Sequence, residues 1–197
     1  MSKSNINIQL IVEGCRRGNR NSQRILFEHF FGYGMNVCLC YAKNREEAEE
    51  ILNNGFLKVF RFIDKYDSEY SFTTWLRRIM VNTAIDYHRA NQKALRFLEL
   101  KAAADVEESE IPMPKLSPDE DVLPVLQKLS PRYRMVFNLH VMEGYRHDEI
   151  AEMLGISSSA SRSNLVRAKR QLKTIILKNS GKEKALTYKP KKEKEHG

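Results

Sequence analysis

The sequence predicts an all-α protein with two small helical domains. Apolar residues recur at spacings of three and four along most of the 197 residues, and no alternating strand pattern competes with them. Cap residues, prolines and glycines stand where such helices would begin and end. An acidic, proline-containing stretch without apolar periodicity separates the two helical blocks.

Net charge changes sign along the chain and divides it into segments. It is +5 over residues 1–104, −6 over 105–121, +6 over 122–178 and +3 over 179–197. We therefore predict a first domain over 1–97, an acidic flexible linker over 98–117, a second domain over 118–178 and a disordered Lys-rich tail over 179–197. The total charge of +8 indicates a polyanionic partner.

Composition and motifs exclude several classes of protein. No apolar run approaches the eighteen or so residues of a membrane helix, so no membrane insertion is expected. The N-terminus lacks a signal-peptide pattern and the cysteines number three, which predicts a cytoplasmic protein. Without a phosphate-binding loop or nucleophile elbow, we expect neither an enzyme nor a cofactor. A zinc site at Cys38, Cys40 and His29 is a minor alternative to simple burial of the cysteines.

Four helices are expected in the first block. Apolar stripes run over residues 8–15, 26–41, 48–63 and 72–87. Asn44, with Glu47 three residues later, is typical of an N-cap pair that opens the third helix, and Ser71 can cap the fourth. Gly55 in the interior of the third helix costs about 1 kcal/mol of helix stability.

Helix ends are marked more sharply in the second block. Ser117-Pro118 and Ser130-Pro131 each place a cap before an N1 proline, and Gly144 and Gly155 suit positions just after a helix. Four helices are predicted, over about 118–129, 131–143, 147–154 and 157–178. Gly155 permits a tight left-handed turn between the last two, which is typical of a helix-turn-helix domain.

The helix after Gly155 carries polar residues suited to DNA. Its first turns offer hydroxyls and an arginine for base edges, and later basic residues suit phosphates. The predicted DNA-binding residues are Ser158, Ser159, Arg162, Ser163 and Arg167. A helical bundle with a solvated basic face is the simpler alternative, but the Gly155 turn favours DNA.

Aromatic and basic residues are interleaved around the fourth helix. This mixture suits single-stranded nucleic acid, because bases stack on rings for about 1–3 kcal/mol each while basic groups follow the backbone. The candidate contacts are Tyr66, Tyr70, Trp75, Arg78, Asn82 and Arg89. Trp75 suits either the core or a base, whereas Tyr66 and Tyr70 are expected to be exposed.

Three motifs, in this order, resemble a bacterial RNA polymerase sigma factor of the extracytoplasmic-function (ECF) class. Residues 47–60, EAEEILNNGFLKVF, resemble the family's polymerase-binding helix. Residues 71–79, SFTTWLRRI, with Asn82 and Asp86, resemble its promoter-melting helix. Residues 149–157, EIAEMLGIS, and 165–169, LVRAK, resemble its domain for the upstream promoter element.

The resemblance implies binding rather than catalysis: a sigma factor that directs promoter-specific initiation of transcription. Core polymerase would be bound by Glu49, Glu50, Leu52, Asn53 and Phe56 of the third helix. The helix after Gly155, which is the recognition helix, would read the −35 element. The fourth helix would capture bases of the −10 element as the DNA melts. The implied partners are the clamp and flap regions of core RNA polymerase, promoter DNA, and an anti-sigma factor, which the family often has.

Some positions depart from the family's pattern. Asn53 and Asn54 stand where Gln and Glu are usual. Ala160-Ser161 replaces a usual Thr-Val and puts a hydroxyl near the buried side of the recognition helix, and Asn164 replaces a common Arg.

The length of the linker limits how the two domains can reach their sites. Residues 98–121 span about 80 Å when extended but average about 27 Å as a relaxed coil. Two DNA elements that lie two helical turns of duplex apart are separated by about 70 Å. The linker must therefore be nearly extended to join elements that far apart, and its acids suit a polymerase channel normally taken by nucleic acid.

A stand-alone helix-turn-helix regulator with a helical sensor domain is the alternative function. It would need a dimer surface or a ligand pocket, and the sequence has no dedicated coiled-coil heptad.

Overall fold

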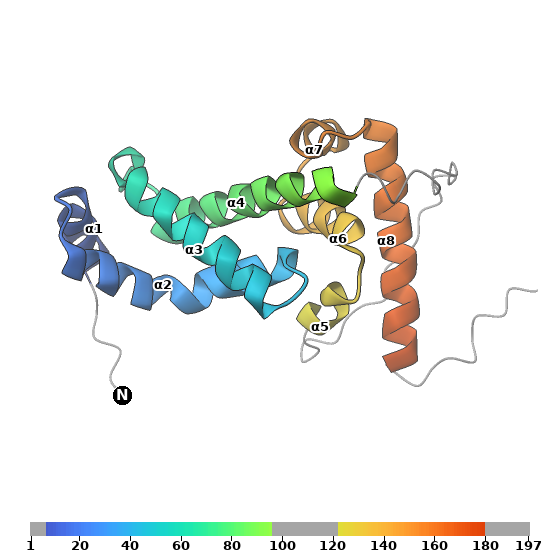
Figure 1. Ribbon diagram of the computed structural model, residues 1–197, viewed down its shortest axis with the longest axis horizontal. Coiled ribbons are helices and arrows are strands. Elements are labelled where there is room, and N and C mark those ends of the chain that lie inside the picture. The colour runs from blue at the N-terminus through green and yellow to red at the C-terminus, as the bar shows by residue number, and fades with distance from the viewer. Residues whose placement is uncertain (1–6, 96–121, 180–197) are drawn as a thin grey trace, which may run out of the picture.

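The computed structural model describes residues 7–95 and 122–179, which form helices and their short connections (Figure 1). The first block contains α1 (Ile8–Arg16), α2 (Arg20–Tyr41), α3 (Arg45–Arg61), the 3₁₀ turn η1 (Ile63–Lys65) and α4 (Phe72–Leu95). The second contains α5 (Val122–Gln127), α6 (Pro131–Phe137), the π-helical turn η2 (Asn138–Met142), α7 (His147–Leu154) and α8 (Ser158–Asn179). The all-α fold class is confirmed, while the predicted linker, the Ser117-Pro118 cap and the tail from residue 180 lie outside the described residues.

The predicted start of α3 is confirmed, with one change of partner. Asn44 Oδ1 accepts a hydrogen bond from the Glu47 backbone N–H at 2.9 Å. Glu47 Oε2 accepts from the backbone N–H of Lys43, at 2.8 Å, rather than from the cap residue itself. The backbone N–H groups of Lys43 and Glu47, at the start of α3, thereby gain hydrogen-bond partners, which stabilises this end of the helix.

The helix predicted over 131–143 is not continuous α-helix. Pro131 opens it after Ser130, as expected, but the α-helical part ends at Phe137. A wider turn follows, closed by a hydrogen bond from the Glu143 N–H to the Asn138 carbonyl at 3.0 Å. Such π turns are uncommon and often lie at functional positions, and this one lies at the contact between the two blocks.

Close helix contacts in the first block depend on two glycines. A Cβ added at Gly55 of α3 would lie 2.4 Å from Met80 Sδ of α4, and one at Gly34 of α2 would lie 2.7 Å from Leu52 Cδ1. Met80 and Leu52 have no exposed surface. Gly55 therefore weakens α3 as a helix but allows α3 and α4 to approach, which explains a residue that local propensity disfavours.

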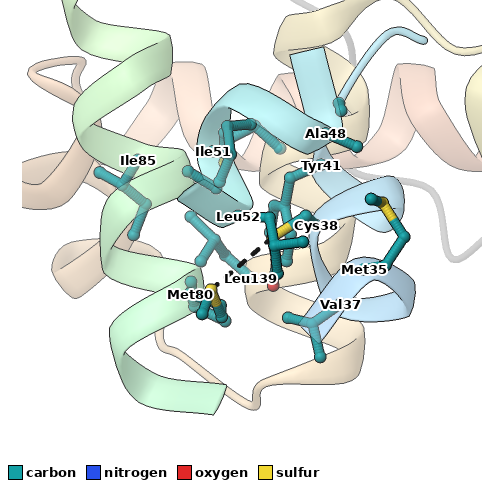
Figure 2. Packing of buried hydrophobic residues seen from close by; sticks show 14 of the residues in the cluster. Met35, Val37, Cys38, Tyr41, Ala48, Ile51, Leu52, Met80, Ile85 and Leu139 are labelled. Carbon is teal, nitrogen blue, oxygen red and sulfur yellow. Dashed lines mark hydrogen bonds between the residues drawn. The ribbon is translucent and has the colours of Figure 1, made fainter. Parts of the chain in front are cut away.

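The two blocks pack against each other and share one continuous hydrophobic core. α2 contacts α5 and α6, and α4 contacts α7. Figure 2 shows Leu139 of η2 beside Cys38 of α2 and Met80 of α4, with the thiol of Cys38 3.8 Å from Met80 Sδ. Leu139 of the second block is fully buried, and residues of the first block cover part of its side chain.

Gly55→Ala is expected to destabilise the protein by about 1–2 kcal/mol, because overpacking at Met80 outweighs the gain in helix propensity. The measurement is the urea midpoint of unfolding. Gly32→Ala is the matched control: Gly32 also lies in a helix interior, but a Cβ there meets nothing within 4 Å. The control should unfold at the same or a higher urea concentration, and equal effects of the two variants would contradict the packing account.

His88 of α4 gives the fold an acid sensitivity. Burial, followed by Arg132 and Arg134 of α6, lowers the pKa of His88 from 6.5 to about 4. The unfolded chain therefore binds a proton at His88 more readily than the folded chain, and stability falls as pH drops from 6.5 towards 4. Above pH 6.5 the residue is neutral in both states and contributes no pH dependence.

His88→Gln is expected to remove about 1–2 kcal/mol of the stability lost between pH 7 and pH 5. Urea unfolding of both proteins at the two pH values measures the difference. His29→Gln is the control, since His29 is exposed. An unchanged acid loss in His88→Gln would contradict the assignment.

Candidate nucleic-acid and polymerase interfaces

The helix-turn-helix is present in the second block. Gly155 follows α7 with φ +64°, in the left-handed region, and its N–H donates to the Ala151 carbonyl. The N–H of Ile156 donates to the same carbonyl at 3.1 Å. Ser157 then caps α8, its Oγ accepting from the Ala160 N–H at 3.0 Å. The predicted glycine turn is thus confirmed, and α8 begins directly after it, in contact with α7.

The predicted DNA-reading residues lie on the first three turns of α8. Ser159 is exposed, and Ser158, Arg162, Ser163 and Arg167 are half-buried. Arg162 Nη1 donates to Ser158 Oγ at 3.0 Å, and Ser158 Oγ donates to Asp148 Oδ1 at 2.8 Å. This chain of hydrogen bonds ties the guanidinium to α7 and restricts its conformations.

The opposite side of α8 contains a buried polar cluster. Ser161 has no exposed surface, and its Oγ lies 2.9 Å from His147 Nδ1. The ring of His147 stacks on His140 with centroids 4.4 Å apart, and His140 Nδ1 lies 2.9 Å from the Tyr145 carbonyl oxygen. Ser161, whose hydroxyl departs from the family's pattern, therefore joins α8 to the start of α7. Nothing in the sequence indicated that His147 would be its partner.

One face of α4 carries the predicted contacts to opened DNA. Arg78, Asn82 and Arg89 are exposed at helical spacing, and Trp75 is half-buried at the start of the same stripe. Asp86, one turn beyond Asn82, is paired with Lys58 Nζ of α3 at 2.8 Å. The pairing offsets the negative charge that the carboxylate would otherwise place near a nucleic-acid backbone.

The structure corrects the expectation for Tyr66. Tyr66 is 7% exposed, packed against Phe72 and Trp75 with centroids 5.2 and 5.3 Å away. Its hydroxyl donates to the Tyr70 carbonyl at 2.7 Å, and its own carbonyl accepts from Arg16 Nη2 at 2.6 Å. Tyr66 is therefore a support for the loop, whereas Tyr70 is 70% exposed as predicted.

The outer face of α3 differs in part from the predicted polymerase-binding set. Glu50 and Asn53 are exposed and Glu49 is half-buried. Leu52 and Phe56 are 0% and 2% exposed, so they lie in the core and not on the outer face of the helix. Their apolar stripe points inward because it packs on α2 and α4.

Leu57 is the residue of α3 that sequence reasoning missed. It is 67% exposed, on the turn after Asn53. The available signal was an apolar residue outside the buried stripe of the helix, although single exposed apolar residues are common on protein surfaces.

No helix in the described ranges has both the length and the apolar character needed to span a membrane. Among those residues, no group of three or more His, Cys, Asp or Glu side chains is arranged to hold a metal ion.

Family models match both blocks. Sigma-70 region 2 matches residues 26–94, and Sigma-70 region 4 matches residues 120–172. The two matches together cover more than half of the chain, in the order expected from the sequence motifs.

Curated relatives agree with this assignment. The chain is 24% identical over 179 residues to the ECF RNA polymerase sigma-E factor of Haemophilus influenzae, covering 85% of this chain and 94% of that protein. It is 23% identical over 175 residues to the RNA polymerase sigma-H factor of Pseudomonas aeruginosa, covering 83% and 91%. A solved structure of the sigma factor RpoE with the anti-sigma factor NepR from Bartonella quintana matches with a TM-score of 0.43 and 17% identity, covering 79% of this chain and 96% of that one.

The fold, the helix-turn-helix and the two matched regions define a sigma factor of bacterial RNA polymerase. Within that class, the chain belongs to the extracytoplasmic-function family. It directs polymerase to promoters and initiates transcription there.

Ser161→Ala is expected to cost about 1–2 kcal/mol of stability, because it leaves His147 without its buried hydroxyl partner. Ser159→Ala, which alters an exposed serine two residues earlier on the same helix, should change stability by less than about 0.5 kcal/mol. Urea unfolding compares the two variants. A loss in Ser161→Ala no larger than in Ser159→Ala would show that the cluster does not stabilise α8.

Proposed function

We propose that this sigma factor divides promoter recognition between α8 and α4. The first turns of α8, with Ser158, Ser159, Arg162 and Ser163, read the −35 element as duplex, and Arg167 contacts its backbone. The observation that carries the α4 assignment is the stripe of exposed Arg78, Asn82 and Arg89 with Trp75 at one end. Arginines at this spacing suit an unpaired strand, and Trp75 together with exposed Tyr70 suits stacking on bases of the −10 element.

Core polymerase is bound by the outer face of α3 in this proposal. Glu49, Glu50 and Asn53 supply polar contacts, and exposed Leu57 supplies apolar surface that binding would remove from water. Leu52 and Phe56 act from the core by fixing the helix on α2 and α4. We place the protein in the cytoplasm with its polymerase, assign it no catalytic activity of its own, and keep an anti-sigma partner as a prediction of family membership.

The stand-alone regulator is not favoured as a second function. A sensor domain would leave the match of the first block to Sigma-70 region 2 unexplained. The direct test is in vitro transcription with core polymerase on a library of genomic promoter fragments, followed by mapping of start sites. Transcripts that need this protein are expected, and their complete absence on all fragments would overturn the proposal.

Arg162→Ala is expected to discriminate between base reading and general attraction. A base-contacting arginine contributes about 1–3 kcal/mol at one position, so the variant should lose about tenfold or more in transcription from promoters with a matched −35 element. Arg170→Ala, which removes an exposed arginine two turns further along α8, should weaken all promoters slightly and equally. Equal effects of the two variants on all sequences would remove Arg162 from the base-reading set.

A further inference from the structure

The side chain of Arg162, proposed to read a base, is held from one edge. Its Nη1 donates to Ser158 Oγ at 3.0 Å, one turn earlier on α8. In the described part of the chain its Nε and Nη2 have no hydrogen-bond partner. Two neighbouring N–H groups of an arginine match the O6 and N7 acceptors of guanine in the major groove. The bond to Ser158 therefore fixes the guanidinium and leaves a pair of donors for a base.

Ser158 transmits this constraint to α7. Its Oγ donates to Asp148 Oδ1 at 2.8 Å. The two helices are in direct contact, and Figure 1 shows α7 beside the first turns of α8. A serine hydroxyl carries a single proton, so Ser158 cannot donate to a base while it donates to Asp148. The serine thus links the carboxylate of one helix to the guanidinium of the other.

Stability of α7 alone does not account for Asp148. An acidic residue in the first turn of a helix is favoured by the helix dipole, but Glu149 occupies the same turn and already accepts from the Arg146 N–H at 2.7 Å. Asp148 Oδ1 accepts from a residue outside α7 instead. An exposed carboxylate also repels DNA phosphates. Its place beside the DNA-reading turns is better explained by its bond to Ser158.

We propose that Asp148 is a positioning residue for the −35 element: it fixes Ser158, and Ser158 fixes Arg162 in the orientation that reads a base. The inference rests on the proposed function and refines it, since Ser158 then acts through Arg162 rather than as a donor to a base of its own. An arginine side chain loses rotamer freedom when an interface orders it, and these bonds supply part of that order before DNA binds. Selectivity at one base pair therefore depends on a residue outside the recognition helix.

The test is transcription by core polymerase with the full-length protein on a promoter library randomised across the −35 element. Sequencing of the transcripts gives the selectivity for each base at each position. Arg162→Ala identifies the base pair that Arg162 reads. Asp148→Ala and Ser158→Ala are each expected to lower selectivity at that same pair by about threefold to tenfold, and to leave the other pairs unchanged.

Further variants separate positioning from charge and from folding. Asp148→Asn keeps an oxygen that accepts from Ser158 and should retain most of the selectivity. Glu152→Ala removes an exposed carboxylate from the same helix and should change selectivity at no pair. Added to Arg162→Ala, Asp148→Ala should cause no further loss, because both changes remove the same contact. A merely structural role of Asp148 would instead lower transcription from all sequences and would add to the effect of Arg162→Ala.

The outcomes separate this inference from the proposed function. Wild-type selectivity in Asp148→Ala, or an equal loss at all base pairs, would overturn the positioning role and leave the proposed function intact. A loss in Ser158→Ala at a different pair from the one lost in Arg162→Ala would show that Ser158 reads a base directly, and would also overturn it. If the wild-type protein gave no transcripts beyond those of core polymerase alone, the proposed function would fail and the inference with it.

Discussion

The C-terminal end of α2 is the position on which the arrangement of the two domains depends. The residue after α2, Ala42, has extended backbone. No glycine stands there to cap the last carbonyls of the helix through a left-handed turn. Arg134 and Asn138 of the second domain satisfy two of those carbonyls instead. Leu139 enters the core beside Cys38 and Met80 from the same side (Figure 2). Separation of the domains therefore exposes both a helix end and part of a core.

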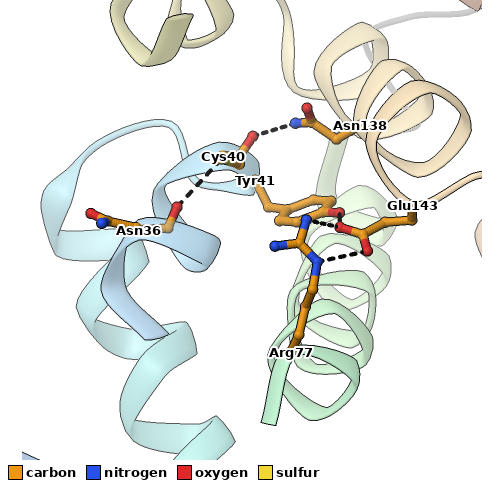
Figure 3. A network of polar contacts seen from close by, with 6 residues as sticks. All are labelled: Asn36, Cys40, Tyr41, Arg77, Asn138 and Glu143. Atoms are coloured by element: carbon orange, nitrogen blue, oxygen red, sulfur yellow. Dashed lines mark hydrogen bonds and ion pairs between the residues drawn. The ribbon is translucent and has the colours of Figure 1, made fainter. Parts of the chain in front are cut away.

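The interface between the two domains contains both favourable and unfavourable polar groups. Charge-assisted hydrogen bonds from Arg77 to Glu143 favour contact between the domains (Figure 3), whereas the unsatisfied Arg134 Nε and Asn138 Oδ1 oppose it. Interfaces between domains of one chain are often of this reversible type. His88 of the first domain, beside Arg132 and Arg134 of the second, makes this contact sensitive to acid.

Local features were predictable from sequence, and long-range ones were not. The Asn44 cap and the Gly155 turn were predicted because their partners lie within a few residues. Burial of Tyr66 was missed because it depends on Phe72, Trp75 and Arg16 meeting around one loop. Exposure of Leu57 was missed because apolar periodicity predicts only the buried side of a helix. The bond from Arg134 to Ala42 joins residues 92 positions apart, for which periodicity carries no information.

The distance between the two domains in the free wild-type chain tests their packed arrangement most directly. Spin labels at exposed Gln9 of α1 and Gln171 of α8, introduced as Gln9→Cys and Gln171→Cys, allow it to be measured by pulsed electron paramagnetic resonance. Packing of the two domains predicts one narrow distribution of this distance in the free protein, across the long axis on which α1 and α8 lie at opposite ends (Figure 1). A broad distribution in the free protein would contradict the packed arrangement.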